Sequence, residues 1–172
     1  MMGSRPSGDG SQPHHHMNVL FVCDDNAALS IMAQAILRTV APTRFTAHSA
    51  GCFPNRALNA DAIDLLERHH ISATDLQPKS VHAFRASAEA RVDLIITLSD
   101  GAADEDFSHW PGDPFVAHWT VVDATTADAD GALRDSFWTL MRRIKIFASL
   151  PQAKLSRRLL ERRALRLEPG YL

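Results

Sequence analysis

A cysteine stands at a point of the chain where thiol chemistry is favoured. Cys23 ends a short apolar run, and Asp24, Asp25 and Asn26 follow it before a helical pattern begins near Ala27. A strand, a tight loop and a helix start place several backbone N–H groups around one concavity at the positive end of the helix dipole. Such a concavity suits an oxyanion, and the same dipole favours the thiolate form of the cysteine. The stretch therefore predicts an anion-binding site with a nucleophilic sulfur.

The loop resembles the phosphate-binding loop of the low-molecular-weight protein tyrosine phosphatases and of the arsenate reductases related to them. Their pattern is a cysteine, five residues, then an arginine and a serine. Cys23 and Ser30 match the ends of this pattern, and Leu29 stands at the place of the arginine. The anion-binding loop that this resemblance implies consists of Asp24, Asp25, Asn26, Ala27, Ala28, Leu29 and Ser30.

Further pieces of the chain are similar to the arsenate-reductase branch of that superfamily, in matching order and spacing. They are Ser49-Ala50-Gly51, Lys79-Ser80, the segment 110–114 with His118-Trp119, and the segment 147–151. The resemblance extends from residue 18 to about residue 150. It implies a single α/β domain of the low-molecular-weight phosphatase type.

The resemblance also implies a division of catalytic roles. In the family, the cysteine attacks phosphorus or arsenic, the arginine stabilises the transition state, and a late aspartic acid protonates the leaving oxygen. Cys23 is the candidate nucleophile here and Asp123 the candidate general acid, although Ala124 replaces the proline that usually follows that acid. Asp113 is a second candidate acid, because it keeps an Asp-Pro pair.

Two features of the loop argue against efficient catalysis. Leu29 can neither donate a hydrogen bond nor carry the charge that the arginine supplies. Asp24 and Asp25 bring negative charges that raise the pKa of the thiol and repel a phosphate dianion. One like charge at about 4 Å costs on the order of 4 kcal/mol at an effective dielectric constant of about 20. We therefore expect an impaired catalyst that acts in binding or regulation. The alternative is an active phosphatase or arsenate reductase that uses Cys23 and Asp123, with a cation such as Arg56 supplied from another loop.

The chain contains only two cysteines, Cys23 and Cys52. The resemblance to arsenate reductases places further, resolving cysteines at about residues 98–110, and that segment has none. Cys52 is a candidate substitute on the same rim, provided that the two Cα atoms lie within about 7 Å. We expect both to be free thiols in a reducing, cytoplasmic compartment.

An alternative from another class is a receiver domain of a response regulator, whose acidic pair holds Mg²⁺. Asp24 and Asp25 after a first strand resemble that pair. A receiver domain also needs a phosphoacceptor aspartate after its third strand. Asp100 follows the strand predicted at 92–98, but it comes too late in the chain to be that aspartate. We therefore expect no metal and no cofactor, and a metal titration separates the two interpretations.

Composition and charge restrict the partners. With 172 residues and a net charge of -2, the chain has the size of one domain and no overall field that draws it to nucleic acid or a membrane. A small oxyanion or a phosphorylated molecule is the expected ligand.

The chain divides into three predicted segments. Residues 1–16 are predicted to be a disordered leader or an expression remnant, and residues 17–151 the phosphatase-like domain. Residues 152–172 are predicted to form a basic helical tail, which is a candidate homodimer contact.

The elements that must position the loop alternate along the chain. Strands are predicted at 18–22, 44–49, 92–98 and 115–119, and helices at 27–40, 60–70 and 130–150. Such alternation indicates a small parallel sheet of about four strands with helices on both faces. Ligands of these folds bind at the carboxyl ends of the strands, which is where Cys23 is expected to lie.

Overall fold

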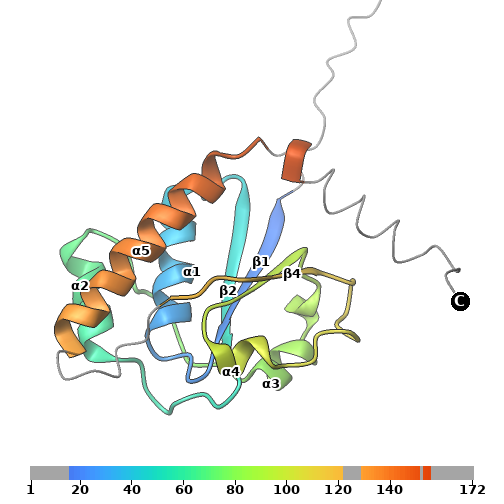
Figure 1. The fold of residues 1–172 in the computed structure, drawn as a ribbon, viewed down its shortest axis with the longest axis horizontal. Helices are drawn as coiled ribbons and strands as arrows, with labels where there is room; N and C mark the ends of the chain where they lie inside the picture. The colour runs from blue at the N-terminus through green and yellow to red at the C-terminus, as the bar shows by residue number, and fades with distance from the viewer. Residues whose placement is uncertain (1–15, 122–128, 152, 156–172) are drawn as a thin grey trace, which may run out of the picture.

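The computed structural model describes residues 16–121, 129–151 and 153–155, and Figure 1 shows their arrangement. Strands and helices alternate along the chain as the sequence predicts. The elements are β1 (Met17–Cys23), α1 (Leu29–Val40), β2 (Phe45–Gly51), α2 (Ala60–Arg68), α3 (Val81–Arg85), the 3₁₀ helix η1 (Ala88–Ala90), β3 (Leu94–Thr97), α4 (Asp100–Ala103), β4 (Phe115–His118) and α5 (Ala129–Ser149).

The four strands form one parallel sheet in the order β2-β1-β3-β4, which confirms the predicted fold class. β1 lies in the interior of the sheet and ends at Cys23, so the candidate nucleophile stands at the carboxyl edge. In the register, Val22 is opposite Thr97, and Thr97 is opposite His118. The ends of three strands therefore meet in one row beside the loop.

Both faces of the sheet are covered, and β1 alternates between them because successive side chains of a strand point to opposite faces. Val19, Phe21 and Cys23 contribute to a larger core with α1, α2 and α5. Leu20 and Val22 contribute to a smaller core with residues of α3 and α4. Figure 1 shows α1 and α5 side by side over one face of the sheet.

The helix boundaries differ from the predicted ones by one or two residues. Asn59 caps α2, since its side chain accepts a hydrogen bond from the N–H of Ala62. The helix ends at Arg68, and His70 beyond it has a positive φ of 57°, a left-handed conformation that terminates helices. α3 and α4 were not predicted, because four or five residues are too few to show a helical repeat.

Several expectations fall outside the described residues. Asp123 lies there, as do residues 1–15 and 156–172, so the leader and most of the tail stay predictions. Among the helices that the structure does describe, none combines the length and apolarity needed to cross a bilayer.

Candidate active site

The thiol of Cys23 lies inside the turn between β1 and α1. Its Sγ is 2.9 Å from the hydroxyl oxygen of Ser30, in the first turn of α1. The residue is only 2% exposed. The two ends of the cysteine-to-serine pattern are thus in direct contact.

Asn26 holds the middle of the loop. It has a positive φ of 48°, a conformation that asparagine tolerates better than most residues, and it is fully buried. Its Nδ2 donates to the Ser30 hydroxyl at 2.8 Å, and its Oδ1 accepts the N–H of Lys79 at 2.7 Å. A Cβ added at Gly51 would come within 2.8 Å of the Asn26 nitrogen, so only glycine fits there. The segments 49–51 and 79–80 therefore support the loop directly.

The connection from β2 to α2 fixes the loop carbonyls. Backbone N–H groups of this connection donate to the loop one after another: Phe53 to Asp24 at 2.7 Å, Asn55 to Asp25 at 2.8 Å and Asn59 to Ala27 at 3.0 Å. These three hydrogen bonds tie the loop to the connection that precedes α2.

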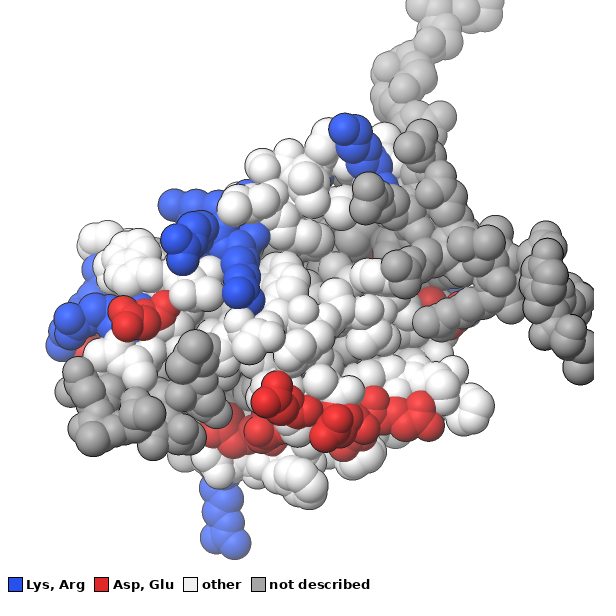
Figure 2. All heavy atoms as spheres, in the orientation of Figure 1, with Lys and Arg blue, Asp and Glu red and all other residues white. Residues whose placement is uncertain are grey.

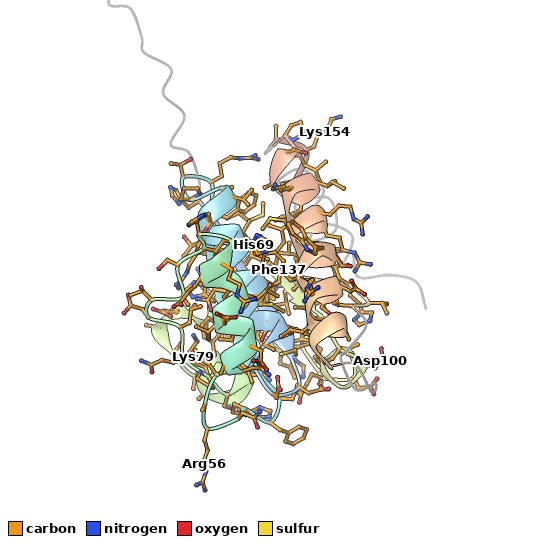
Figure 3. All side chains as sticks on the ribbon, turned by 90° about the vertical axis from the view of Figure 1, so that its left-hand side faces the viewer. Arg56, His69, Lys79, Asp100, Phe137 and Lys154 are labelled. Carbon is orange, nitrogen blue, oxygen red and sulfur yellow. The ribbon has the colours of Figure 1, made fainter. Side chains whose placement is uncertain are left out.

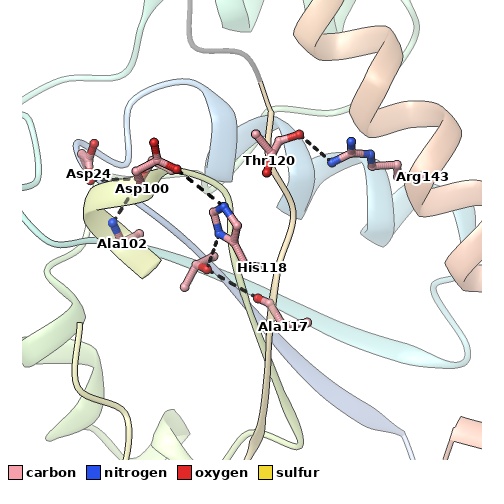
Figure 4. Close-up of polar contacts among 9 residues, drawn as sticks. Asp24, Asp100, Ala102, Ala117, His118, Thr120 and Arg143 are labelled. Atoms are coloured by element: carbon pink, nitrogen blue, oxygen red, sulfur yellow. Dashed lines mark hydrogen bonds and ion pairs between the residues drawn. The ribbon is translucent and has the colours of Figure 1, made fainter. Parts of the chain in front are cut away.

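The two loop aspartates have different surroundings. The Oδ1 of Asp25 accepts the N–H of Ala27 at 3.0 Å and lies 3.6 Å from the Cys23 sulfur. The carboxylate of Asp24 accepts the Ser99 hydroxyl at 2.9 Å and packs on α4, where a Cβ added at Gly101 would lie 2.3 Å from its Oδ1 (Figure 4). Only Asp25 therefore contacts the thiol.

The thiol is held in its protonated form. Burial, with a smaller contribution from the negative charge of Asp25, raises the pKa of Cys23 from 9.0 to about 11, although hydrogen bonding by Ser30 acts in the opposite direction. The helix start that was expected to favour the thiolate does not dominate. The raised pKa favours the neutral thiol, the less nucleophilic form of the sulfur, at neutral pH.

Leu29, which stands where the family pattern has an arginine, is part of the hydrophobic core. Leu29 is 5% exposed and packs in the larger core. Arg56, considered as a substitute cation, is exposed, and Figure 3 shows its side chain projecting away from the molecule. Within the described residues, neither side chain supplies a charge to the loop.

The two cysteines are both free and buried. Their backbones are neighbours, because the Cys52 N–H donates to the Cys23 carbonyl at 3.1 Å. Their side chains, however, belong to the two different cores, on opposite faces of the sheet. Burial and the nearby carboxylates of Glu105 and Asp24 raise the pKa of Cys52 to about 12. Cys52 is thus on the expected rim, and its side chain packs in the smaller core while that of Cys23 packs in the larger one.

Sequence reasoning missed a polar group at the ends of β3 and β4. The Nδ1 of His118 is 2.9 Å from the Thr97 hydroxyl, and its Nε2 is 3.7 Å from Asp100 (Figure 4). The sequence could have indicated this group, because both Thr97 and His118 end strands of a parallel sheet.

Asp113, the second candidate acid, lies in a turn before β4 with a φ of 49°. No cluster of metal-ligating side chains occurs in the part of the chain that the structure describes.

Comparisons with known proteins agree with this geometry. The sequence profile of the family described as low molecular weight phosphotyrosine protein phosphatase matches residues 18–111. The low-molecular-weight protein-tyrosine-phosphatase PtpB of Staphylococcus aureus is 30% identical over 84 residues, which cover 48% of this chain and 57% of PtpB. The match thus spans little more than half the length of that relative.

Solved structures extend the similarity over more of the chain. The arsenate reductase of Archaeoglobus fulgidus has a TM-score of 0.62 at 26% identity, covering 77% of this chain and 99% of that protein. YwlE of Bacillus subtilis, solved as a mutant, has a TM-score of 0.61 at 20% identity, covering 77% and 96% of the two chains. At that identity the second comparison shows the fold alone.

Proposed function

This chain belongs to the low-molecular-weight phosphotyrosine protein phosphatase family, and we propose that its loop acts in binding or regulation and not in efficient phosphoryl transfer. Phosphoryl transfer needs a thiolate that attacks and a cation that stabilises the equatorial oxygens. The proposal rests on what occupies these two places.

The observation that carries the proposal is the burial of Leu29. Its side chain packs in the larger core at the place of the arginine. The loop therefore lacks a bidentate donor for the charge that develops in the transition state. Removal of a preorganised donor of this kind costs about 10²- to 10³-fold in rate in other enzymes.

Asp25 supports the same proposal. Its carboxylate already accepts a loop N–H, from Ala27, which a bound oxyanion would otherwise use. A phosphate dianion would have to displace this carboxylate or lie beside it, against repulsion. A singly charged oxyanion meets less repulsion, so a phosphodiester, a sulfonate or another monoanion is the ligand class that we propose.

An active enzyme is the second candidate, and the intact loop favours it. The Asn26 side chain still joins Ser30 and Lys79, so the scaffold around the thiol is complete. A phosphatase of this kind would need a cation other than Arg56 and would use Asp123 as the acid. Arsenate reduction coupled to a Cys23–Cys52 disulfide is disfavoured, because the two side chains belong to opposite faces of the sheet.

Hydrolysis of an aryl phosphate tests the proposal. The purified chain should show no turnover above that of its Cys23→Ser variant. Wild-type turnover of order 1 s⁻¹ or more, abolished by Cys23→Ser, would show that another group replaces the arginine.

A binding experiment complements the assay. At about pH 8.5, where inorganic phosphate is almost entirely the dianion, we expect it to raise the melting temperature of Asp25→Asn but not that of the wild type. Asp24→Asn is the matched control, because it removes the same charge where the carboxylate faces Ser99. Equal stabilisation of all three proteins would contradict the role assigned to Asp25.

A further inference from the structure

The solvent-facing side of α5 combines large apolar side chains with cations. Trp138 is 49% exposed, Ile146 60%, and Leu150, just past the helix, 41%. Three exposed basic residues and the exposed Asp135 lie among them, and together these seven side chains are called the outer α5 face: Arg134, Asp135, Trp138, Arg142, Lys145, Ile146 and Leu150. Exposed apolar groups gathered on one surface indicate an interaction site.

The opposite charge gathers around α4. Asp100, Asp104 and Asp106 are exposed and Glu105 is half-buried, and these four residues are called the acidic rim. Figure 2 shows Lys and Arg over α5 at the upper left and Asp and Glu along the lower edge, where α4 lies. On this face the cations thus gather mainly over α5 and the carboxylates mainly along the lower edge, although a few charges of both signs lie side by side at the left.

The acidic rim also has an apolar neighbour. Phe53 is 81% exposed, the largest exposed fraction among the large hydrophobic residues that the structure describes. Its N–H donates to the carbonyl of Asp24, whose carboxylate packs on α4. An exposed aromatic ring and a row of carboxylates therefore lie close to the same loop.

Charge excludes two other occupants of the outer α5 face. Residues 156–172 contain five arginines and two glutamates, so this segment has the same sign as the face and would be repelled by it. A symmetric contact between two α5 faces would likewise bring two surfaces together that each carry three cations and one carboxylate, which is a net repulsion. The face needs an occupant with carboxylates and an exposed apolar group.

We propose that the outer α5 face of one copy of this chain docks on the acidic rim of a second copy. Carboxylates then meet cations, and Phe53 meets the apolar side chains of α5. The net charge of only -2 leaves little general repulsion between copies. The contact is heterologous, so it leaves one free face and one free rim on each dimer. A docked copy would lie next to the loop of Cys23, because Asp24 joins that loop to α4.

Charge reversal tests this contact in the full chain. The face variant carries Arg142→Glu and Lys145→Glu, and the rim variant carries Asp104→Lys and Asp106→Lys. By sedimentation velocity at about 20 mM salt, the wild type should have a weight-average mass that rises with concentration, and at about 500 mM salt it should be monomeric. Each variant alone should stay monomeric at low salt.

The mixture of the two variants is the decisive sample. The face variant keeps an intact rim and the rim variant an intact face, so an equimolar mixture should form a species of about twice the monomer mass. Arg91→Glu, which reverses an exposed cation outside the face, is the control and should associate like the wild type. Circular dichroism confirms that each variant is folded.

Three results would overturn the inference. They are a wild type that stays monomeric at low salt, a mixture of variants that stays monomeric, and a face variant that associates like the wild type. Vesicles of phosphatidylcholine and phosphatidylserine form a separate arm. A monomeric wild type that binds them through the outer α5 face would assign this face to an anionic bilayer instead.

Discussion

The carboxylate of Asp25 lies 3.6 Å from the sulfur of Cys23, while the carboxylate of the adjacent Asp24 faces Ser99 on the far side of the loop. The sequence alone treats the two aspartates as equal sources of repulsion. The structure assigns the effect on the thiol to one of them. This difference makes Asp24 the natural control for every experiment on Asp25.

Alkylation of the thiol measures this difference. In a Cys52→Ala background, iodoacetamide should react with Cys23 very slowly at pH 7, because a pKa of about 11 leaves on the order of 10⁻⁴ of the sulfur as thiolate. Asp25→Asn should increase the rate, since it removes a charge that raises the pKa. Asp24→Asn should change the rate much less. Rapid reaction of the wild type at pH 7 would refute the assignment of a protonated thiol.

The raised pKa also predicts a loss of stability in alkali. The pKa of Cys23 is 9.0 in the unfolded chain and about 11 in the folded one, so its contribution is complete below pH 9 and is lost as the pH rises through 11. The full loss amounts to about 3 kcal/mol of unfolding free energy. Urea unfolding at pH 8 and pH 10.5 should show a smaller decrease for Cys23→Ala than for the wild type. Equal decreases would mean that the buried thiol does not titrate in this range.

Repair of the loop should require two changes together. Leu29→Arg alone places a guanidinium where Leu29 now packs in the hydrophobic core, and it should destabilise the fold by several kcal/mol without giving activity. Asp25→Asn alone leaves the transition-state charge unmet. The combined variant should gain aryl phosphatase activity that depends on Cys23 and is weakened by Asp123→Asn. The measurable quantity is the non-additive term between the two changes. If the effects of the two changes on the phosphatase rate were simply additive in free energy, the prediction that both are needed together would be wrong.

Two glycines beside the loop should respond differently to alanine. A Cβ at Gly51 meets the backbone nitrogen of Asn26 at 2.8 Å, so Gly51→Ala should cost about 1–3 kcal/mol of unfolding free energy. A Cβ at Gly101 meets the carboxylate of Asp24, a side-chain end that can move. Gly101→Ala should therefore cost less, and Asp24→Ala should remove most of that cost in a double-mutant cycle by thermal or urea unfolding. A larger cost at Gly101 would show that the Asp24 side chain cannot move aside.

The sequence by itself determined the architecture and the place of the candidate loop within it. Hydrophobic periodicity is a local property, so strands such as 18–22 and 92–98 are readable without a partner, and their alternation with helices predicts a parallel sheet. The carboxyl edge and the position of Cys23 on it follow from that sheet, since β1 must end where the apolar run ends. The family resemblance rests on the same local spacing from Cys23 to Ser30.

Only the tertiary structure decided which way the side chains of the loop point. Leu29 packs into the core because α1 lies against α5, and Cys52 faces the other core because it follows β2 by one residue. The contacts of Asp24 with Ser99 and of Asn26 with Lys79 join residues 75 and 53 positions apart in the chain. Such contacts depend on how distant elements pack, and no local pattern of residue types contains that information. Whether this site binds a charged ligand is therefore decided by packing and not by the motif.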